Sequence, residues 1–218
     1  MVRCIEPSIN TIAQALDIVK GLTAPSKLPC HSYNIPAIEC NVGSRLREVE
    51  GTVCFECYAH KGLYRKYKKT VDPSQRRRFE ALDHPQWVEA MTYLVTKRKM
   101  DIFRWFDSGD LQSIQHLSNI VDVATNCPSC KFWLPTREYV IVSSFIREHG
   151  KLPSNLILRL SAHIIDGKAP TALARRLGVR TSTVVTSGAS CPSKQQGNKC
   201  LECRACWSLV ENISYKKD

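Results

Sequence analysis

The sequence predicts an α/β protein in which β/α repeats form a parallel sheet resembling a partial or distorted TIM barrel. Short aromatic and β-branched runs alternate with segments of helical periodicity, and polar residues follow each run directly. The 218 residues, 43% of them apolar, suit one folded unit. We expect a single domain over 1–218, with a loop-rich N-terminal region at 1–70, a β/α core at 100–188 and a cysteine-rich segment at 189–210.

The individual elements follow from local patterns. A short helix is expected over 11–20, and Asp72-Pro73 and Asp83-His84-Pro85 each place a proline where a first helical turn can accept it. Strand-like runs and helical stripes then alternate through the core. The strands are expected at 102–106, 131–135, 156–160 and 183–186, and the helices between them at 111–124, 139–148 and 171–177, the last ending before Gly178.

The strongest motif is a group of four cysteines near the C-terminus. Cys191, Cys200, Cys203 and Cys206 have the spacing C-x8-C-x2-C-x2-C. Closely spaced thiolates with one more distant partner are typical of [4Fe-4S] ligation, although the distant cysteine precedes the triplet here. Zinc is the competing metal, since it also accepts four thiolates. Zinc is usually held by two separated pairs, so the triplet favours the cluster.

Other cysteines suggest a second site. Cys54 and Cys57 form a C-x2-C pair, and Cys30 and Cys40 are further candidate ligands. The alternative is that these four cysteines are buried or redox-reactive thiols without a metal. A cluster held by four cysteines leaves no iron open to substrate, so electron transfer or a structural role is expected for it. Radical chemistry on S-adenosylmethionine needs three cysteines, and the segment at 54–57 supplies only two. The Cys127/Cys130 pair fits a plain turn.

Polar residues at the strand ends form a candidate catalytic group. Functional residues of parallel α/β proteins collect at the carboxyl ends of the strands. Asp107, Asp110, Arg137 and His163 all follow predicted strands and could bind a polar ligand or move protons. The structural alternatives are that Asp110 caps the next helix, that Arg137 pairs with Asp107, and that His163 is an ordinary loop residue.

The charge balance leaves polyanions open as partners. Lys and Arg number 31 against 20 Asp and Glu, a formal charge of +11. The basic stretch from Tyr64 to Arg78 interleaves tyrosines with cations, a pattern that can bind nucleic acid through base stacking and phosphate contacts. The alternative is that this stretch is a solvated helix surface. There is no apolar run of 18 residues and no signal-peptide pattern at the N-terminus, so we expect a cytoplasmic protein without a membrane partner.

Taken together, four segments resemble the bacteriophage gene product 88 domain family. They are Cys54-Phe55-Glu56-Cys57-Tyr58-Ala59, the run from Phe103 to Asp110, the run from Arg159 to His163, and the segment from Cys191 to Trp207. The resemblance covers most of the chain. It implies a phage protein of the host cytoplasm with a barrel-like α/β body and a C-terminal cluster, and it implies no particular reaction.

Three functions are therefore expected in decreasing order. The first is a redox-active [4Fe-4S] protein whose cluster lies next to a polar pocket and exchanges electrons with a host protein. Such a protein could be an enzyme that acts on a ligand in this pocket. The second is a nucleic-acid-binding module with a structural cluster or zinc. The third is radical catalysis at the Cys54/Cys57 pair.

Overall fold

The computed structural model describes residues 8–217, so Cys4 and the N-terminal residues used in the signal-peptide argument lie outside the description. Its centre is one six-stranded sheet in which every strand is parallel to its neighbours and the spatial order equals the chain order. This is the expected β/α class, and the sequential order is that of a partial barrel. The strands are β1 Ser32–Tyr33, β2 Ile102–Trp105, β3 Lys131–Thr136, β4 Leu156–Ser161, β5 Arg180–Val185 and β6 Asn212–Lys216.

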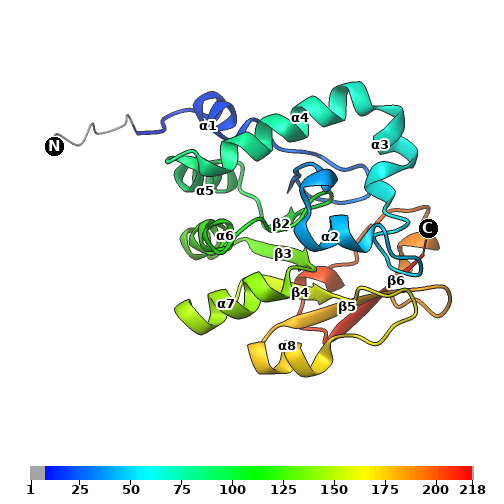
Figure 1. The fold of residues 1–218 in the computed structure, drawn as a ribbon. Coiled ribbons are helices and arrows are strands. Elements are labelled where there is room, and N and C mark those ends of the chain that lie inside the picture. The colour runs from blue at the N-terminus through cyan, green and yellow to red at the C-terminus, as the bar shows by residue number, and fades with distance from the viewer. Residues whose placement is uncertain (1–7, 218) are drawn as a thin grey trace.

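Helices alternate with these strands and form a row along one face of the sheet (Figure 1). The α-helices are α1 Ile12–Val19, α2 Asn41–Leu46, α3 Gly62–Lys66, α4 Lys68–Glu80, α5 Trp87–Lys97, α6 Ile114–Asn126, α7 Tyr139–His149 and α8 Thr171–Leu177. The short 3-10 helices are η1 Ala37–Glu39, η2 Tyr58–His60, η3 Ala81–Asp83, η4 Pro192–Lys194 and η5 Ala205–Trp207.

The main core lies between this row of helices and the sheet. Successive strand residues point to opposite faces, so Phe103 and Trp105 of β2 and Phe132 and Leu134 of β3 face the helices. All four are fully buried, and Phe103 meets Trp105 edge to face at 4.9 Å. Such aromatic pairs stabilise the core beyond their buried area.

The opposite face, here called the inner face, is covered by the chain between β5 and β6. Trp133 of β3 lies on this face and packs edge to face on Trp207, with the ring centres 5.3 Å apart. The Trp207 indole N–H donates to the carbonyl of Phe103 at 2.8 Å. The cysteine-rich segment is therefore a structural layer of the protein, held against the sheet by tryptophan packing.

The predicted core strands are confirmed, with β5 beginning three residues earlier than expected. Two edge strands and α2 were not predicted. Helix α4 begins at Lys68 rather than at Asp72, so Pro73 lies inside it. The proline is tolerated there because the N–H it lacks would have bonded the carbonyl of Lys69, an exposed residue that water can reach.

The Cys127–Cys130 segment is the plain turn that was predicted. The side-chain amide of Asn155 donates to the carbonyls of Ala124, Cys127 and Cys130 at 2.8 to 3.0 Å, which fixes the turn before β3. Both cysteines are buried. Separately, no helix in residues 8–217 combines the length and apolar character needed to cross a membrane.

His116 of α6 makes the fold sensitive to acid. Its ring is buried against Trp87 and Phe106, and neither ring nitrogen has a hydrogen-bond partner among the described residues. Burial lowers its pKa to about 3. The pKa of His116 is therefore lower in the folded than in the unfolded protein. Its effect on the free energy of unfolding is most favourable above about pH 6.5, and this free energy declines by up to about 1.4 kcal/mol per pH unit as the pH falls toward 3.

The His116→Leu variant is expected to lose that dependence. Between pH 7 and pH 5 its free energy of unfolding should fall by about 2 kcal/mol less than that of the wild type. Urea unfolding at both pH values measures the difference. His84→Leu, at an exposed position, is the matched control and should keep the wild-type pH dependence. Equal slopes for His116→Leu and the wild type would contradict the assignment.

Candidate functional site

The four C-terminal cysteines lie together on the inner face. The backbone is fixed on both sides of the group, because the Cys191 N–H donates to the carbonyl of Ser214 in β6 and the Cys200 N–H donates to the carbonyl of Lys27, both at 3.0 Å. The Cys203 N–H closes a turn onto the carbonyl of Cys200 at 2.9 Å. The segment is thus tied to β6 and to the N-terminal region at the same time.

Packing places these thiols near one another, because Cys30, Cys191 and Cys200 all pack against the hydrophobic group that contains Cys206. Burial, first of all, raises the pKa of Cys200, and the nearby Cys191 and Cys203 raise it further. Burial also raises the pKa of Cys206 to about 11, with Cys191 again contributing. Cys30, whose pKa rises to about 12 chiefly through burial, is a further neighbour of Cys200. Four thiols of the predicted motif and one unpredicted partner therefore occupy one region.

Arg159 of β4 holds the segment in place. The side chain is fully buried on the inner face and donates five hydrogen bonds, all to backbone carbonyls. No carboxylate in the described part of the chain pairs with it. The accepting carbonyls belong to Thr181, Ala205, Cys206, Ser208 and Val210, at 2.8 to 3.2 Å. A guanidinium can serve this many carbonyls because its five N–H groups are fixed in one plane.

A second buried cation lies beside the thiols. Arg104 of β2 stacks over Trp133, with 4.3 Å between the guanidinium carbon and the ring centre, and pairs with Asp107 at 2.9 Å. Its charge lowers the pKa of both Cys30 and Cys206, against the larger effect of burial. Together with Arg159 it makes this region of the inner face suited to an anionic group.

The donor set can be compared with a metal group. The cysteines are free thiols in this structure, and within residues 8–217 no three His, Cys, Asp or Glu side chains are arranged to hold a metal ion. The donors nevertheless fit a thiolate-ligated group in type, number and common location, with two cations nearby. Such a group would bind with release of the thiol protons, because only thiolates are ligands.

At the carboxyl ends of the strands, Asp110 is the buried centre of a second region. Its carboxylate accepts from the Thr136 hydroxyl at 2.6 Å and from the backbone N–H groups of Arg137 and Leu111 at 2.9 and 2.8 Å. Burial still raises its pKa, and these hydrogen bonds oppose the rise. The helix-cap alternative is wrong, because Ser113 caps α6 by accepting from the His116 N–H.

Arg137 lies next to Asp110 and His163 lies beside Arg137, whereas Asp107 has other partners. Arg137 donates through Nε to the carbonyl of Ala162 at 3.4 Å and makes no ion pair with Asp107. His163 stacks on Tyr139 at 4.6 Å, its Nε2 has no partner among the described residues, and burial lowers its pKa. Asp107 instead pairs with Arg104 and accepts from the Tyr64 hydroxyl at 2.8 Å. The predicted group is therefore divided between the two regions.

Three thiols that the spacing did not unite also reach the strand ends. Cys40, Cys54 and Cys57 are mutual neighbours, since Cys54 and Cys57 each raise the pKa of Cys40 after the dominant effect of burial. Asp110 is a further neighbour of Cys40 and Cys54. The sequence named both Cys30 and Cys40 as further candidates beside the Cys54/Cys57 pair. The structure places Cys40 near the pair and Cys30 near Cys200 on the inner face.

The basic segment is only partly available to a partner. The Tyr64 hydroxyl donates to Asp107, and Arg78 is buried and donates to the carbonyl of Asn34 at 2.7 Å, so both polar groups are already engaged within the protein. Arg76 pairs with Glu39 at 2.6 Å. The cations that remain exposed on α3 and α4 are Arg65, Lys66, Lys68, Lys69 and Arg77.

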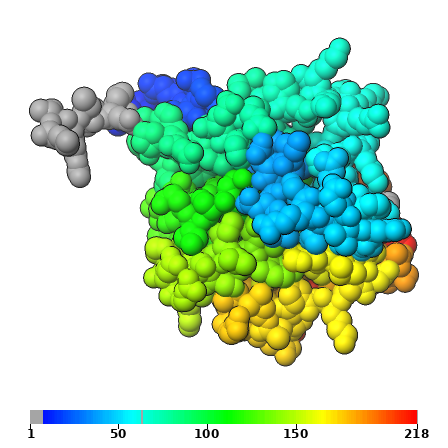
Figure 2. Space-filling view, in the orientation of Figure 1, coloured from blue at the N-terminus to red at the C-terminus, as the bar shows by residue number. Residues whose placement is uncertain are grey.

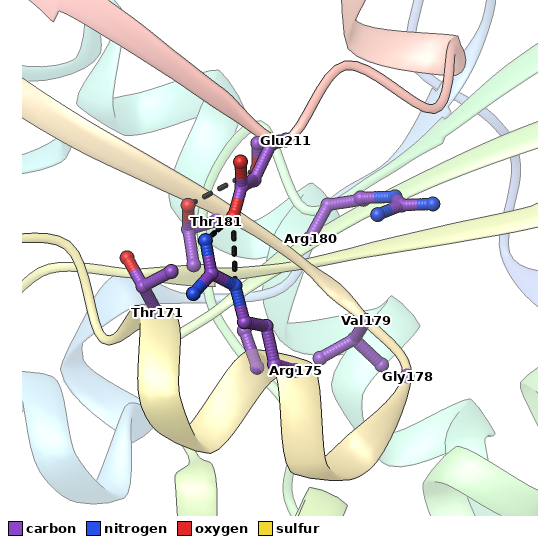
Figure 3. A pocket seen from close by; sticks show the side chains of 8 residues that line it. Thr171, Arg175, Gly178, Val179, Arg180, Thr181 and Glu211 are labelled. Carbon is purple, nitrogen blue, oxygen red and sulfur yellow. Dashed lines mark hydrogen bonds and ion pairs between the residues drawn. The ribbon is translucent and has the colours of Figure 1, made fainter.

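The hollow shown in Figure 3 lies elsewhere. It is lined by residues of α8, of the turn after this helix and of the start of β5, including Thr171, Gly178 and Thr181. The Arg175–Glu211 ion pair at 2.8 Å crosses it. This is the amino-terminal edge of the sheet, where parallel β/α proteins place stabilising rather than functional residues.

Comparison with known proteins identifies one family. Residues 10–209 match the model of the family described as gene product 88. No curated protein and no solved structure matches the chain.

Proposed function

The chain belongs to the gene product 88 family, and from that premise we propose that it is a redox-active iron-sulfur protein. Cys191, Cys200, Cys203 and Cys206 would hold a [4Fe-4S] cluster on the inner face. The observation that carries the proposal is that four cysteines with cluster-type spacing share one region, fixed by the five hydrogen bonds of Arg159. When bound, such a cluster supplies one-electron transfer.

The surroundings favour an anionic, electron-accepting group over neutral thiols. Arg104 and Arg159 are buried cations beside the cysteines, and a tetrathiolate cluster would place negative charge against them. Leu201, Leu209 and Val210 are exposed in the same segment and would give an electron-transfer partner of the host an apolar contact. At the strand ends, Asp110, Arg137 and His163 would form the polar pocket of an enzyme.

Metal analysis after anaerobic purification tests the proposal. The wild type should contain iron and acid-labile sulfide and absorb in the visible range, and Cys203→Ala should lose about four irons. Cys127→Ala, in the turn before β3, is the matched control and should keep the full content. Stoichiometric zinc without sulfide would replace the cluster with a structural zinc site and refute the redox function. A cluster that dithionite cannot reduce would also refute it.

Tyr215 is expected to tune the reduction potential. Its hydroxyl lies 3.3 Å from the Cys206 sulfur, and it must be the donor once that sulfur is a thiolate. A hydrogen bond to a ligand sulfur stabilises the reduced, more negative cluster. Tyr215→Phe should therefore lower the potential, by about 40 mV if the bond contributes about 1 kcal/mol.

Redox titration followed by electron paramagnetic resonance (EPR) measures this shift. Tyr93→Phe, in α5 on the opposite side of the sheet, removes a hydroxyl that donates to the carbonyl of Asn10 and serves as control. An unchanged or higher potential in Tyr215→Phe would show that the hydroxyl does not donate to the cluster.

We also propose nucleic acid as a partner, supported by the exposed cations of α3 and α4. Retention on DNA or RNA should then decrease with salt and should be lost on reversing Lys66, Lys68 and Lys69 to glutamate. Retention that survives this reversal would exclude the segment as the interface.

A further inference from the structure

We propose that Cys40, Cys54 and Cys57 hold a second [4Fe-4S] cluster whose fourth iron is left open, and that S-adenosylmethionine binds to this iron. The second cluster is separate from the one at the C-terminal cysteines. It lies at the carboxyl ends of the strands, where parallel β/α proteins bind their ligands.

Two of the three sulfurs border one space beside Gly43, and Cys57 is a neighbour of both. A Cβ placed on Gly43 would lie 3.6 Å from the Cys40 sulfur and 3.7 Å from the Cys54 sulfur, so both thiols border the same side of α2. Cys57 is brought back to Cys54 by a turn in which its N–H donates to the Cys54 carbonyl at 3.2 Å. Glycine at position 43 keeps the space beside the sulfurs free of a side chain. Three thiolates can thus converge on one cubane.

The loop carrying these cysteines is fixed over the sheet. The Val53 N–H donates to the carbonyl of His163 at 2.8 Å, and the Ile165 N–H donates to the carbonyl of Gly51 at 3.0 Å, which ties the loop to the end of β4. The Val42 N–H donates to the Glu138 carboxylate at 2.8 Å, which ties it to the end of β3. In Figure 2 this part of the chain, in blue and light blue, covers the middle of the face shown.

The region offers no fourth thiol. Among the described cysteines, Cys127 and Cys130 lie in the turn before β3, and the remaining five gather on the inner face. Asp110 already accepts three hydrogen bonds. A four-iron cluster on three thiolates keeps one iron without a protein sulfur, which is the opening that a small ligand needs.

The neighbouring groups fit an amino acid chelating that iron. Arg137 is close enough to Cys54 to lower its pKa, and its two terminal nitrogens have no hydrogen-bond partner among the described residues. A guanidinium in this position suits the carboxylate of a methionine moiety. Glu138 is a further neighbour of Cys54, and its carboxylate, which already accepts from the Val42 N–H, would be the acceptor for an ammonium group.

The two cysteine regions are also connected. Tyr58 directly follows Cys57, and its hydroxyl donates to the backbone carbonyl of Asp107. Asp107 in turn pairs with Arg104, which is a neighbour of Cys200 and Cys206. An electron entering at the C-terminal cluster would therefore have a short polar route to the second one.

Iron counts on three variants test the proposal. Anaerobically reconstituted wild type should hold about eight irons, Cys54→Ala and Cys203→Ala about four each, and Cys127→Ala about eight. A wild type with about four irons, all retained in Cys54→Ala, would overturn the second cluster and leave the proposed function intact. The reverse pattern, with iron retained in Cys203→Ala and lost in Cys54→Ala, would overturn the proposed function alone.

EPR spectroscopy of the wild type tests the open iron directly, without depending on the folding of a variant. After dithionite reduction, S-adenosylmethionine should shift the EPR g-values of one cluster and leave the other unchanged. The shift should persist in Cys203→Ala and be absent in Cys54→Ala. Methionine alone, which carries the same amino and carboxylate groups, should compete with it. Spectra that S-adenosylmethionine leaves unchanged would overturn the open-iron assignment.

Discussion

Arg159→Met is expected to destabilise the protein by about 3 to 5 kcal/mol, because it leaves five backbone carbonyls, two of them buried and three partly buried, without the donor group that they share. Each buried acceptor without a partner costs about 1 to 3 kcal/mol, and partial relaxation or water entry recovers some of that. Methionine preserves the volume of the arginine stem, so the change isolates the hydrogen bonds from the packing.

The measurement is urea unfolding, with iron content determined on the same preparations. Arg175→Met is the matched control, since Arg175 is exposed and pairs only with Glu211, and an exposed ion pair is worth about 0 to 1 kcal/mol. Because Arg159 fixes the backbone on both sides of Cys206, iron should decrease together with stability. An Arg159→Met protein that unfolds at the wild-type urea concentration would show that the carbonyls find other donors.

Gly109→Ala is the second large effect, and its cost should exceed about 3 kcal/mol. The residue follows β2 with φ of +86°, and a Cβ there would lie 2.3 Å from Cγ1 of Ile35 and 2.8 Å from the Ile35 carbonyl oxygen. The side-chain clash could be relieved by a rotamer change, but the clash with the carbonyl requires the backbone after β1 to move. That backbone is held by the Ile35 N–H, which donates to the carbonyl of Ser108 at 3.2 Å.

Thermal and urea unfolding of Gly109→Ala and Gly178→Ala separate the two causes. Gly178 also has positive φ, +70°, with nothing within 4 Å of its Cβ position, so only the backbone conformation is penalised, at about 1 kcal/mol. A Gly109→Ala protein no less stable than Gly178→Ala would mean that the close approach to Ile35 is not maintained in solution.

The core strands were predictable because they are long enough to show a pattern. β2, β3 and β4 are four to six residues long, and three or four residues of each are β-branched, aromatic or leucine. Their burial on both faces follows from helices on one side and the cysteine segment on the other. β1 has two residues and β6 contains Asn212 and Ser214. Neither strand has a hydrophobic run that the sequence could show. Both are strands because their backbones pair with a neighbouring strand, which depends on the tertiary fold.

The site was predictable in its parts and not in its grouping. The C-terminal cysteines could be united because their ligand spacing is local, and Asp110, Arg137 and His163 could be united because strand ends meet at one edge. Asp107 separated from them because the backbone turns at Phe106, whose φ is +55°, and its carboxylate reaches Arg104. The sequence offered Cys30 and Cys40 equally as partners of Cys54 and Cys57 and could not choose between them, since only the tertiary fold of the loop returns Cys40 to Cys54.

The position of β6 at the edge of the sheet has a consequence for the exposure of the thiols. The Ser214 carbonyl of this strand accepts from Cys191, and its Tyr215 reaches the Cys206 sulfur. β6 pairs with β5 alone, so its release from the edge would break no hydrogen bond among β1 to β5. Both contacts to the cysteine segment would be lost at the same time. Fraying of this single strand is therefore the smallest opening of the fold that uncovers Cys191 and Cys206.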